Sequence, residues 1–219
     1  MRMRRVALPL VLVALMAIPA DAADQLDARD APETTGPLEA GEKGCDGGTE
    51  KHEGEVVARV RLCYRLFLVN VEEEDDEERD FGAIWLQSTV DAKRGWCTTA
   101  VRTSALVSSD GTIHARTPSR RITAKRARSV TRGLKIDAQG ALADAAKISQ
   151  DFIVYPKRTV PSLNALGDGE RFKLTWKGST ARPLGFAMGA ELSWAQADGS
   201  PQIDPKLTYD FSAKPNGCR

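Results

Sequence analysis

The densest set of chemically active side chains is the acidic run EEEDDEERD at residues 72–80, which holds eight carboxylates and one arginine. Carboxylate oxygens are ligands that Ca²⁺ prefers, but calcium loops place them at alternating positions around a glycine that makes the sharp turn. The run contains no glycine, and its like charges repel one another, which favours an extended, solvated connection. We therefore expect a solvated loop between two strands, and we predict neither a metal site nor a bound cofactor.

General acids, bases and nucleophiles are few. His52 has several acidic residues nearby, whereas His114 is expected at the surface or at a strand edge. The chain lacks H-E-x-x-H, G-x-S-x-G, phosphate-loop and dinucleotide glycine motifs, and its four cysteines are expected in disulfides. We therefore predict no catalytic residue. Carboxylates that converge from distant strands, as in glycosidases, are an alternative that sequence spacing does not test.

A basic stretch is the candidate anion-binding patch. It carries eight cations and no acid: Arg116, Arg120, Arg121, Lys125, Arg126, Arg128, Arg132 and Lys135. Such a patch is suited to phosphate, a sulfated glycan or another anionic polymer. The stretch lacks aromatic rings that could stack on bases, and no nucleic acid partner is expected. The simpler interpretation is a solvated strand face that lies near the acidic run and cancels its charge.

One tryptophan is a candidate for an exposed recognition ring. Trp176 and Trp194 share strand parity with large apolar residues, which predicts that both belong to the core. Trp96 instead alternates with Thr98 and Arg102. An exposed indole beside cations can stack on a sugar or on a partner side chain. The predicted ligand surface consists of Trp96, Lys93, Arg94 and Arg102.

Alternating apolar residues indicate the strands that position these side chains. In residues 55–70 the even positions from 56 to 68 are apolar, whereas Arg59, Arg61 and Arg65 occupy odd ones. A period of two indicates a strand with one buried face. The same pattern recurs at 171–176, 184–194 and 206–211. Further strands are expected at 81–90, 96–107, 112–117, 120–126 and 150–155.

Turn signals set the fold class. SSDGT, DAQG, GDGE and ADGS each place a glycine after a polar residue, where a positive φ is easily reached. Many short strands separated in this way predict an all-β fold, an antiparallel β-sandwich of the jelly-roll or immunoglobulin-like type. One segment differs, because the composition around 139–149 favours a short helix.

The four cysteines, Cys45, Cys63, Cys97 and Cys218, predict two disulfides, since no C-x-x-C spacing suggests a metal site. Cys63 lies on the arginine face of its strand, whereas Cys97 shares parity with apolar residues. Cys63 and Cys97 are therefore unsuited to meet across a core. This parity favours Cys45–Cys63 with Cys97–Cys218 over Cys45–Cys218 with Cys63–Cys97.

The N-terminal segment suggests export. Arg2, Arg4 and Arg5 precede an apolar stretch of thirteen residues and the sequence ADA, which predicts a signal peptide at 1–22. Residues 23–43 are polar and read as a disordered leader or a propeptide, and 44–219 as one disulfide-bonded domain. Without residues 1–22 the chain has a net charge of −1. The excess of arginine over lysine suggests a bacterial source.

These features favour a secreted or periplasmic, non-catalytic binding domain. Its expected ligand is an extracellular protein or polysaccharide, and no membrane insertion is expected after signal cleavage. The alternative is a glycan-active enzyme on a jelly roll with acidic residues in a concave sheet. The sequence leaves the oligomeric state open.

Overall fold

The computed structural model describes residues 33–35, 38–69, 79–108, 111–122, 130–136, 146–152, 158–195, 201–214 and 218, and for 33–35, 130–136 and 146–152 only the backbone. Every regular element in these ranges is a β-strand. The strands are β1 (Glu33–Thr35), β2 (Leu38–His52), β3 (Glu55–Val69), β4 (Arg79–Ala92), β5 (Trp96–Ser108), β6 (Gly111–Thr117), β7 (Val130–Ile136), β8 (Ala146–Phe152), β9 (Val160–Leu166), β10 (Gly169–Thr180), β11 (Leu184–Ala195) and β12 (Ile203–Ala213).

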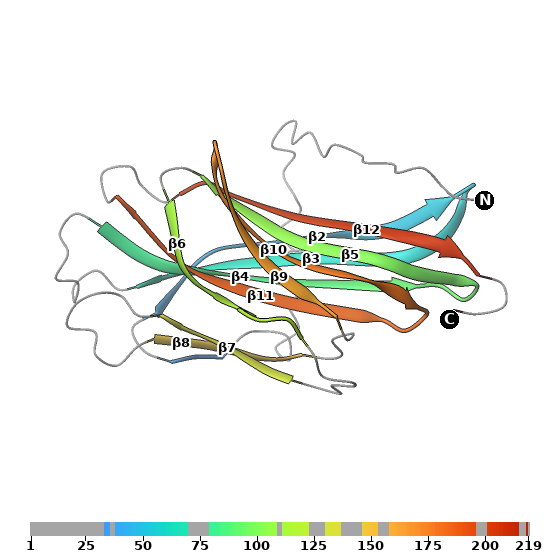
Figure 1. Cartoon of the computed structure of the whole chain (residues 1–219), viewed down its shortest axis with the longest axis horizontal. Coiled ribbons are helices and arrows are strands. Elements are labelled where there is room, and N and C mark those ends of the chain that lie inside the picture. The colour runs from blue at the N-terminus through green and yellow to red at the C-terminus, as the bar shows by residue number, and fades with distance from the viewer. Residues whose placement is uncertain are drawn as a thin grey trace.

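The strands form two large antiparallel sheets that pack as a sandwich, which confirms the predicted fold class. One sheet has the order β12-β5-β10-β9 and the other the order β2-β3-β4-β11-β6 (Figure 1). A smaller antiparallel sheet, β1-β8-β7, lies against β11 and β6. Three layers of sheet therefore meet around β11.

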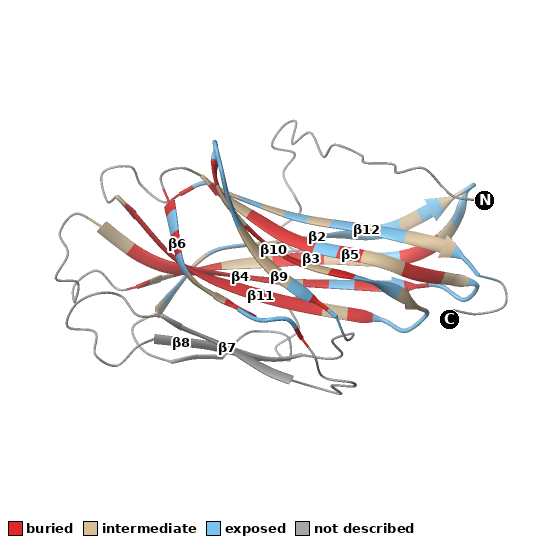
Figure 2. Ribbon diagram, in the orientation of Figure 1, coloured by how far each residue is buried: buried red, intermediate tan, exposed pale blue. Residues whose placement is uncertain are grey.

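The core lies between the two large sheets, and along several strands buried residues alternate with more exposed ones (Figure 2). Phe172, Leu174 and Trp176 of β10 point inward from the four-stranded sheet, and all three are buried. One polar pair bridges the layers, because Ser88 Oγ of β4 and Thr103 Oγ1 of β5 are 2.5 Å apart. A buried hydroxyl needs such a partner, so this hydrogen bond removes the cost of burying both side chains.

Part of the five-stranded sheet is buried on both faces. Along β4 the even positions face the other large sheet, yet Phe81, Ala83 and Trp85 at odd positions are buried as well. The strand β11, which pairs with β4, is buried on both faces over most of its length and contacts β7 and β8. Simple alternation therefore under-predicts the burial of these central strands, because a third layer lies beside them.

Two predictions of local secondary structure need correction. Within the predicted helix at 139–149, residues 146–149 are strand, because they pair with β7 and cross-strand packing overrides a weak local preference; residues 139–145 lie outside the described part. Residues 120–122 of the predicted strand 120–126 are not strand, and 123–126 are likewise outside it.

The expected leader is shorter than predicted, because β2 begins at Leu38. Residues 38–43 pair with the end of β3, from Leu38 opposite Val69 to Lys43 opposite Arg65. The Tyr64 hydroxyl also donates to Glu42 (2.6 Å). Backbone pairing to an existing strand can order a polar segment without much apolar burial of its own, which composition alone does not reveal.

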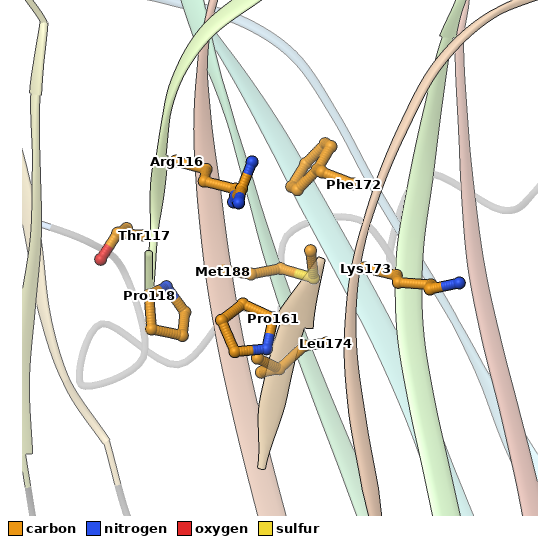
Figure 3. A pocket seen from close by; sticks show the side chains of 8 residues that line it. All are labelled: Arg116, Thr117, Pro118, Pro161, Phe172, Lys173, Leu174 and Met188. Atoms are coloured by element: carbon orange, nitrogen blue, oxygen red, sulfur yellow. The ribbon is translucent and has the colours of Figure 1, made fainter. Parts of the chain in front are cut away.

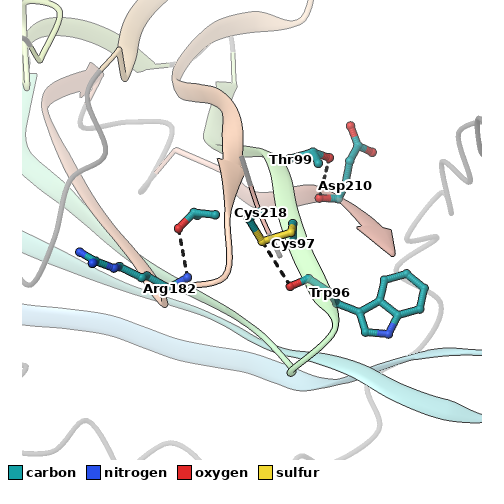
Figure 4. The surroundings of a disulfide bond; sticks show 7 residues. Trp96, Cys97, Thr99, Arg182, Asp210 and Cys218 are labelled. Atoms are coloured by element: carbon teal, nitrogen blue, oxygen red, sulfur yellow. Dashed lines mark hydrogen bonds between the residues drawn. A yellow bond between two sulfur atoms is a disulfide. The ribbon is translucent and has the colours of Figure 1, made fainter. Parts of the chain in front are cut away.

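Both disulfides follow the pairing that strand parity favours. Cys45 is bonded to Cys63, its cross-strand neighbour, with a Cα–Cα distance of 4.0 Å. Cys97 is bonded to Cys218 with a Cα–Cα distance of 5.8 Å (Figure 4). The first bond links two adjacent strands, and the second links the start of β5 to the C-terminal segment that follows β12. Such pairs are typical of proteins that fold in an oxidising compartment.

Candidate binding surface

The outer face of the four-stranded sheet carries an array of cations. Because Phe172, Leu174 and Trp176 point into the core, Arg171, Lys173 and Lys177 of β10 point to the opposite side. Register extends the array to neighbouring strands. Thr175 lies between Lys173 and Lys177 and pairs with Arg102 of β5, and Ser104, two residues further along β5, pairs with Lys206 of β12. This basic face consists of Arg102, Arg171, Lys173, Lys177 and Lys206.

Two carboxylates share the basic face, and both lie on the edge strand β12. Asp204 and Asp210 are exposed there, so the five cations leave an excess of three positive charges. None of the five cations is held in a salt bridge by another residue in the described part of the chain. Among the described residues, no ion pair would have to break before these cations met an external anion.

Strand geometry determines the spacing of these charges. Residues two apart on one strand are separated by about 6.8 Å, and neighbouring strands by about 4.8 Å. The six-residue step from Arg171 to Lys177 thus spans about 20 Å. A flat array with this spacing suits an extended anionic chain better than a single small anion.

The predicted ligand surface is divided between two places. Arg102 is exposed and belongs to the basic face, whereas Lys93 and Arg94 are exposed in the turn between β4 and β5. Trp96 is half-buried, because Thr99 of β5 forms a β-bulge against β12, and the register of β5 against β10 also shifts at this position. A bulge reverses the alternation of side chains beyond it, so the parity that predicted an exposed indole does not hold at this point.

Trp96 contacts His52 at the end of the sandwich. The two rings meet edge to face, with centroids 5.3 Å apart and an interplanar angle of 71°. Next to them the Tyr209 hydroxyl of β12 donates to Glu50 of β2. Burial, followed by the Glu50 carboxylate, raises the pKa of Tyr209 above its usual range. The Tyr209–Glu50 hydrogen bond joins edge strands of the two large sheets, and His52 of β2 packs against the inner strand β5.

The predicted anion patch is placed only in part. Arg116 lies at the end of β6 and Arg120 and Arg121 are exposed just after it. Lys125, Arg126 and Arg128 fall outside the described residues. The backbone of β7 includes Arg132 and Lys135.

A small indentation lies between β6 and the β9–β10 hairpin (Figure 3). It is lined by Arg116, Thr117, Pro118, Pro161, Phe172, Lys173, Leu174 and Met188. Ligand pockets usually enclose about 300–1,000 Å³, whereas this indentation encloses no room for a water molecule, so it is too small for a typical metabolite. No carboxylate lines it, and it therefore offers nothing to a two-carboxylate glycosidase mechanism.

One polar cluster was missed at the level of sequence. Ser193 of β11 is fully buried, and its Oγ lies 2.6 Å from His114 Nε2 and accepts a hydrogen bond from Arg79 (2.8 Å). His114 sits where β6 shifts register against β11, and a bulge of this kind redirects a side chain. The contact could not be inferred from spacing, because Arg79, His114 and Ser193 come from three separate strands.

The Ser193–His114 distance is within the range of a nucleophile and its base, but the surroundings oppose catalysis. Ser193 has no exposed surface that a substrate could reach. The Arg79 guanidinium also occupies one lone pair of Oγ. Burial lowers the pKa of His114, Arg79 lowers it further, and Glu170 partly opposes the shift. The cluster thus joins β4, β6 and β11 through the buried Ser193 hydroxyl.

Within the described ranges, no group of three or more histidine, cysteine or acidic side chains is arranged to hold a metal ion. The acidic run itself falls outside them from residue 72 to residue 78. The described part of the chain contains no apolar helix of membrane-spanning length.

Comparison with known proteins leaves the family open. No family model matches the chain, and no curated protein matches it by sequence. Among solved structures, it is similar to the NetB toxin of Clostridium perfringens in its membrane-inserted form, at 10% identity over 80% of this chain and 94% of that one, with a TM-score of 0.33. A score this low supports no argument about fold or function.

Proposed function

We propose that this protein is an exported, non-catalytic binding domain that holds an acidic polysaccharide on its basic face. The observation that carries the proposal is the register of β12, β5 and β10, which gathers Arg102, Arg171, Lys173, Lys177 and Lys206 on one side of a sheet. A protein ligand was the other expectation. A repeating anionic chain fits better, because cations spaced along a strand match charges spaced along a polymer.

Electrostatic binding of this kind has recognisable properties. Exposed charges are screened by salt, with a Debye length of about 8 Å at physiological ionic strength, so affinity should fall as salt rises. The cations are spread along three strands and do not gather around one point. Recognition would therefore depend on the spacing of carboxylate or sulfate groups more than on sugar identity.

Binding can be measured by calorimetry with three probes: heparin as a sulfated glycan, polygalacturonate as a carboxylated glycan, and dextran as a neutral one. We expect binding of at least one acidic probe and none of dextran. The test variant carries Arg171→Gln, Lys173→Gln and Lys177→Gln. Because each exposed ion pair contributes about 0.2–1 kcal/mol and 1.4 kcal/mol is tenfold, the variant should bind about threefold to a hundredfold more weakly.

A control variant separates the basic face from net charge. Lys51→Gln, Arg59→Gln and Lys214→Gln remove three exposed cations that lie elsewhere and change the net charge equally. The control should keep nearly full affinity. Equal losses in both variants would show that only total charge matters, and they would overturn the proposal. Export is checked separately by the intact mass of secreted protein, which should begin near Ala23.

A further inference from the structure

The edge strand β9 differs from the other edges of the two large sheets. It pairs with β10 on one side, and its sequence VPSLNAL has no charged residue. The opposite edge, β12, carries Asp204, Lys206 and Asp210. In the five-stranded sheet β2 is highly charged, and the Ile113 N–H of β6 donates to Glu170 (2.7 Å). Proteins usually protect edges with charges or covering groups. The backbone of Ile122 bonds to Arg158 and Thr159 just before β9, but within β9 Val160 and Leu166 are exposed, so this uncharged edge suggests a pairing surface.

The hydrogen-bond pattern shows which groups of β9 point outward. Ser108 N of β5 donates to Gln202 O on the β12 side (3.0 Å). In an antiparallel sheet the backbone N–H and C=O groups of successive residues point to the two neighbouring strands in turn, so those of Val107 point to β10. Its partner Glu170 points back to β5, and the next residue, Arg171, therefore points to β9. The partners of Arg171 and Lys173 in β9, Asn164 and Ser162, thus bond to β10. The N–H groups of Leu163 and Ala165 therefore point away from the sheet, as do the carbonyls of Pro161, Leu163 and Ala165.

Pro161 agrees with this assignment. Proline has no N–H, and within sheets it is tolerated where that group would face solvent. Pro205 of β12 also falls at an outward position of its edge strand by the same alternation. With the Asn164 amide oriented to satisfy its neighbours, its nitrogen donates to the Leu163 carbonyl (3.0 Å) and its oxygen accepts from Lys173 Nζ (3.3 Å). The Leu163 carbonyl keeps a second lone pair for an external donor.

From this edge we infer that two copies of the chain associate through β9, antiparallel and two-fold symmetric, with the axis at Leu163. In this register Leu163 of each copy exchanges two hydrogen bonds with Leu163 of the other. Each Ala165 N–H donates to the Pro161 carbonyl of the second copy, which makes four backbone bonds. Because Pro161 has no N–H, the Ala165 carbonyl opposite it accepts no backbone hydrogen bond. No other bond of this register is lost. Two four-stranded sheets then form one sheet of eight strands.

The side chains select the same axis. Val160 and Leu166 are the exposed large hydrophobic residues of the described chain, at 42% and 39% exposure. An axis at Leu163 places Val160 directly opposite Leu166 of the second copy, in a non-hydrogen-bonded pair where side chains approach most closely. Moving the axis to Asn164 would instead set Val160 opposite the Asp168 carboxylate. An isologous interface requires such self-complementarity, which favours a second copy over an unrelated strand.

Sedimentation of the purified protein over a wide concentration series tests the dimer, because an interface of one strand pair belongs to the small, weakly associating class. We expect a reversible monomer–dimer equilibrium. Amide exchange should slow with concentration at Leu163 and Ala165, whose N–H groups point outward. It should not change at Ser162 and Asn164, which already bond to β10. A protein that stays monomeric throughout the series would overturn the inference.

Charge pairs test the register. Val160→Lys with Leu166→Lys places like charges opposite each other across the axis and should abolish the dimer. Val160→Lys with Leu166→Glu places opposite charges there and should retain it. Both variants change exposed side chains, and circular dichroism and melting confirm that each is folded. Equal dimerisation by the two variants, or a dimer that survives the double lysine change, would contradict the proposed pairing.

Discussion

Removing the two disulfides separately should reveal unequal contributions to stability. The perturbation is a pair of double variants, Cys97→Ala with Cys218→Ala and Cys45→Ala with Cys63→Ala, so that neither leaves a free thiol. Cys97 and Cys218 are 121 residues apart, whereas Cys45 and Cys63 are 18 apart. A bond that closes a longer loop removes more freedom from the unfolded chain.

The chain-entropy relation gives the magnitude. Applied to these separations, it gives about 4.9 kcal/mol for Cys97–Cys218 and about 3.2 kcal/mol for Cys45–Cys63 at 25 °C. The difference of about 1.7 kcal/mol exceeds the uncertainty of a good unfolding experiment. At about 2–4 °C per kcal/mol for a chain of this size, the first variant should melt roughly 10–20 °C below the parent protein.

Both variants lose buried sulfur, since Cys97 and Cys63 are each buried, so packing losses are similar and the comparison isolates the loop. Urea unfolding of the oxidised parent and of both variants supplies the free energies. A larger loss in the Cys45–Cys63 variant would refute the reasoning. It would mean that local pairing of β2 with β3, and not chain entropy, dominates the effect.

Three further predictions concern single features. Ser193→Ala should lower the free energy of unfolding by about 1–3 kcal/mol, because Arg79 and His114 lose a buried partner; urea unfolding measures this, with the partly exposed Ser162→Ala as the near-neutral control. Because the folded state lowers the pKa of His114 below 6.5, protonation favours unfolding. Stability should therefore fall as pH drops through 6.5, and His114→Gln should flatten this fall; a pH series of melting curves on both proteins decides. Calcium and EDTA should leave the melting temperature nearly unchanged if the acidic run is only solvated, whereas a calcium-dependent rise of several degrees would reveal a site.

Much of the strand content was predictable, because alternation is a local property. Residues 55–70 and 184–194 show a period of two that needs no knowledge of neighbours, and β3 and β11 form there. The disulfide pairing was accessible for a related reason, since parity places Cys63 on the arginine face of β3. The same rule assigned Cys97 to the inner face. Cys97 lies beyond the bulge at Thr99, where the alternation is reversed and this assignment does not hold. The pairing was therefore favoured partly by an incorrect assignment.

The errors arise where long-range pairing overrides a local signal. Composition at 146–149 favours a helix, but pairing with β7 makes it a strand. Residues 38–43 look disordered, yet β3 supplies them with backbone partners. Trp96 appears exposed by parity until the bulge at Thr99 shifts the register. Each outcome depends on a partner strand that lies far away in the sequence or on one inserted residue, and neither leaves a periodic signal.

The amino-acid sequence alone determined which residues of each strand face together, because neighbouring side chains on an extended backbone must point to opposite sides. Only the tertiary structure decided which strands lie side by side. The basic face needs Arg102, Arg171 and Lys206 from three strands, and the polar cluster needs Arg79, His114 and Ser193 from three others. Strand order is set by the burial of whole sheets against each other, a property of the entire chain, so the surfaces where these strands meet exist only once it has folded.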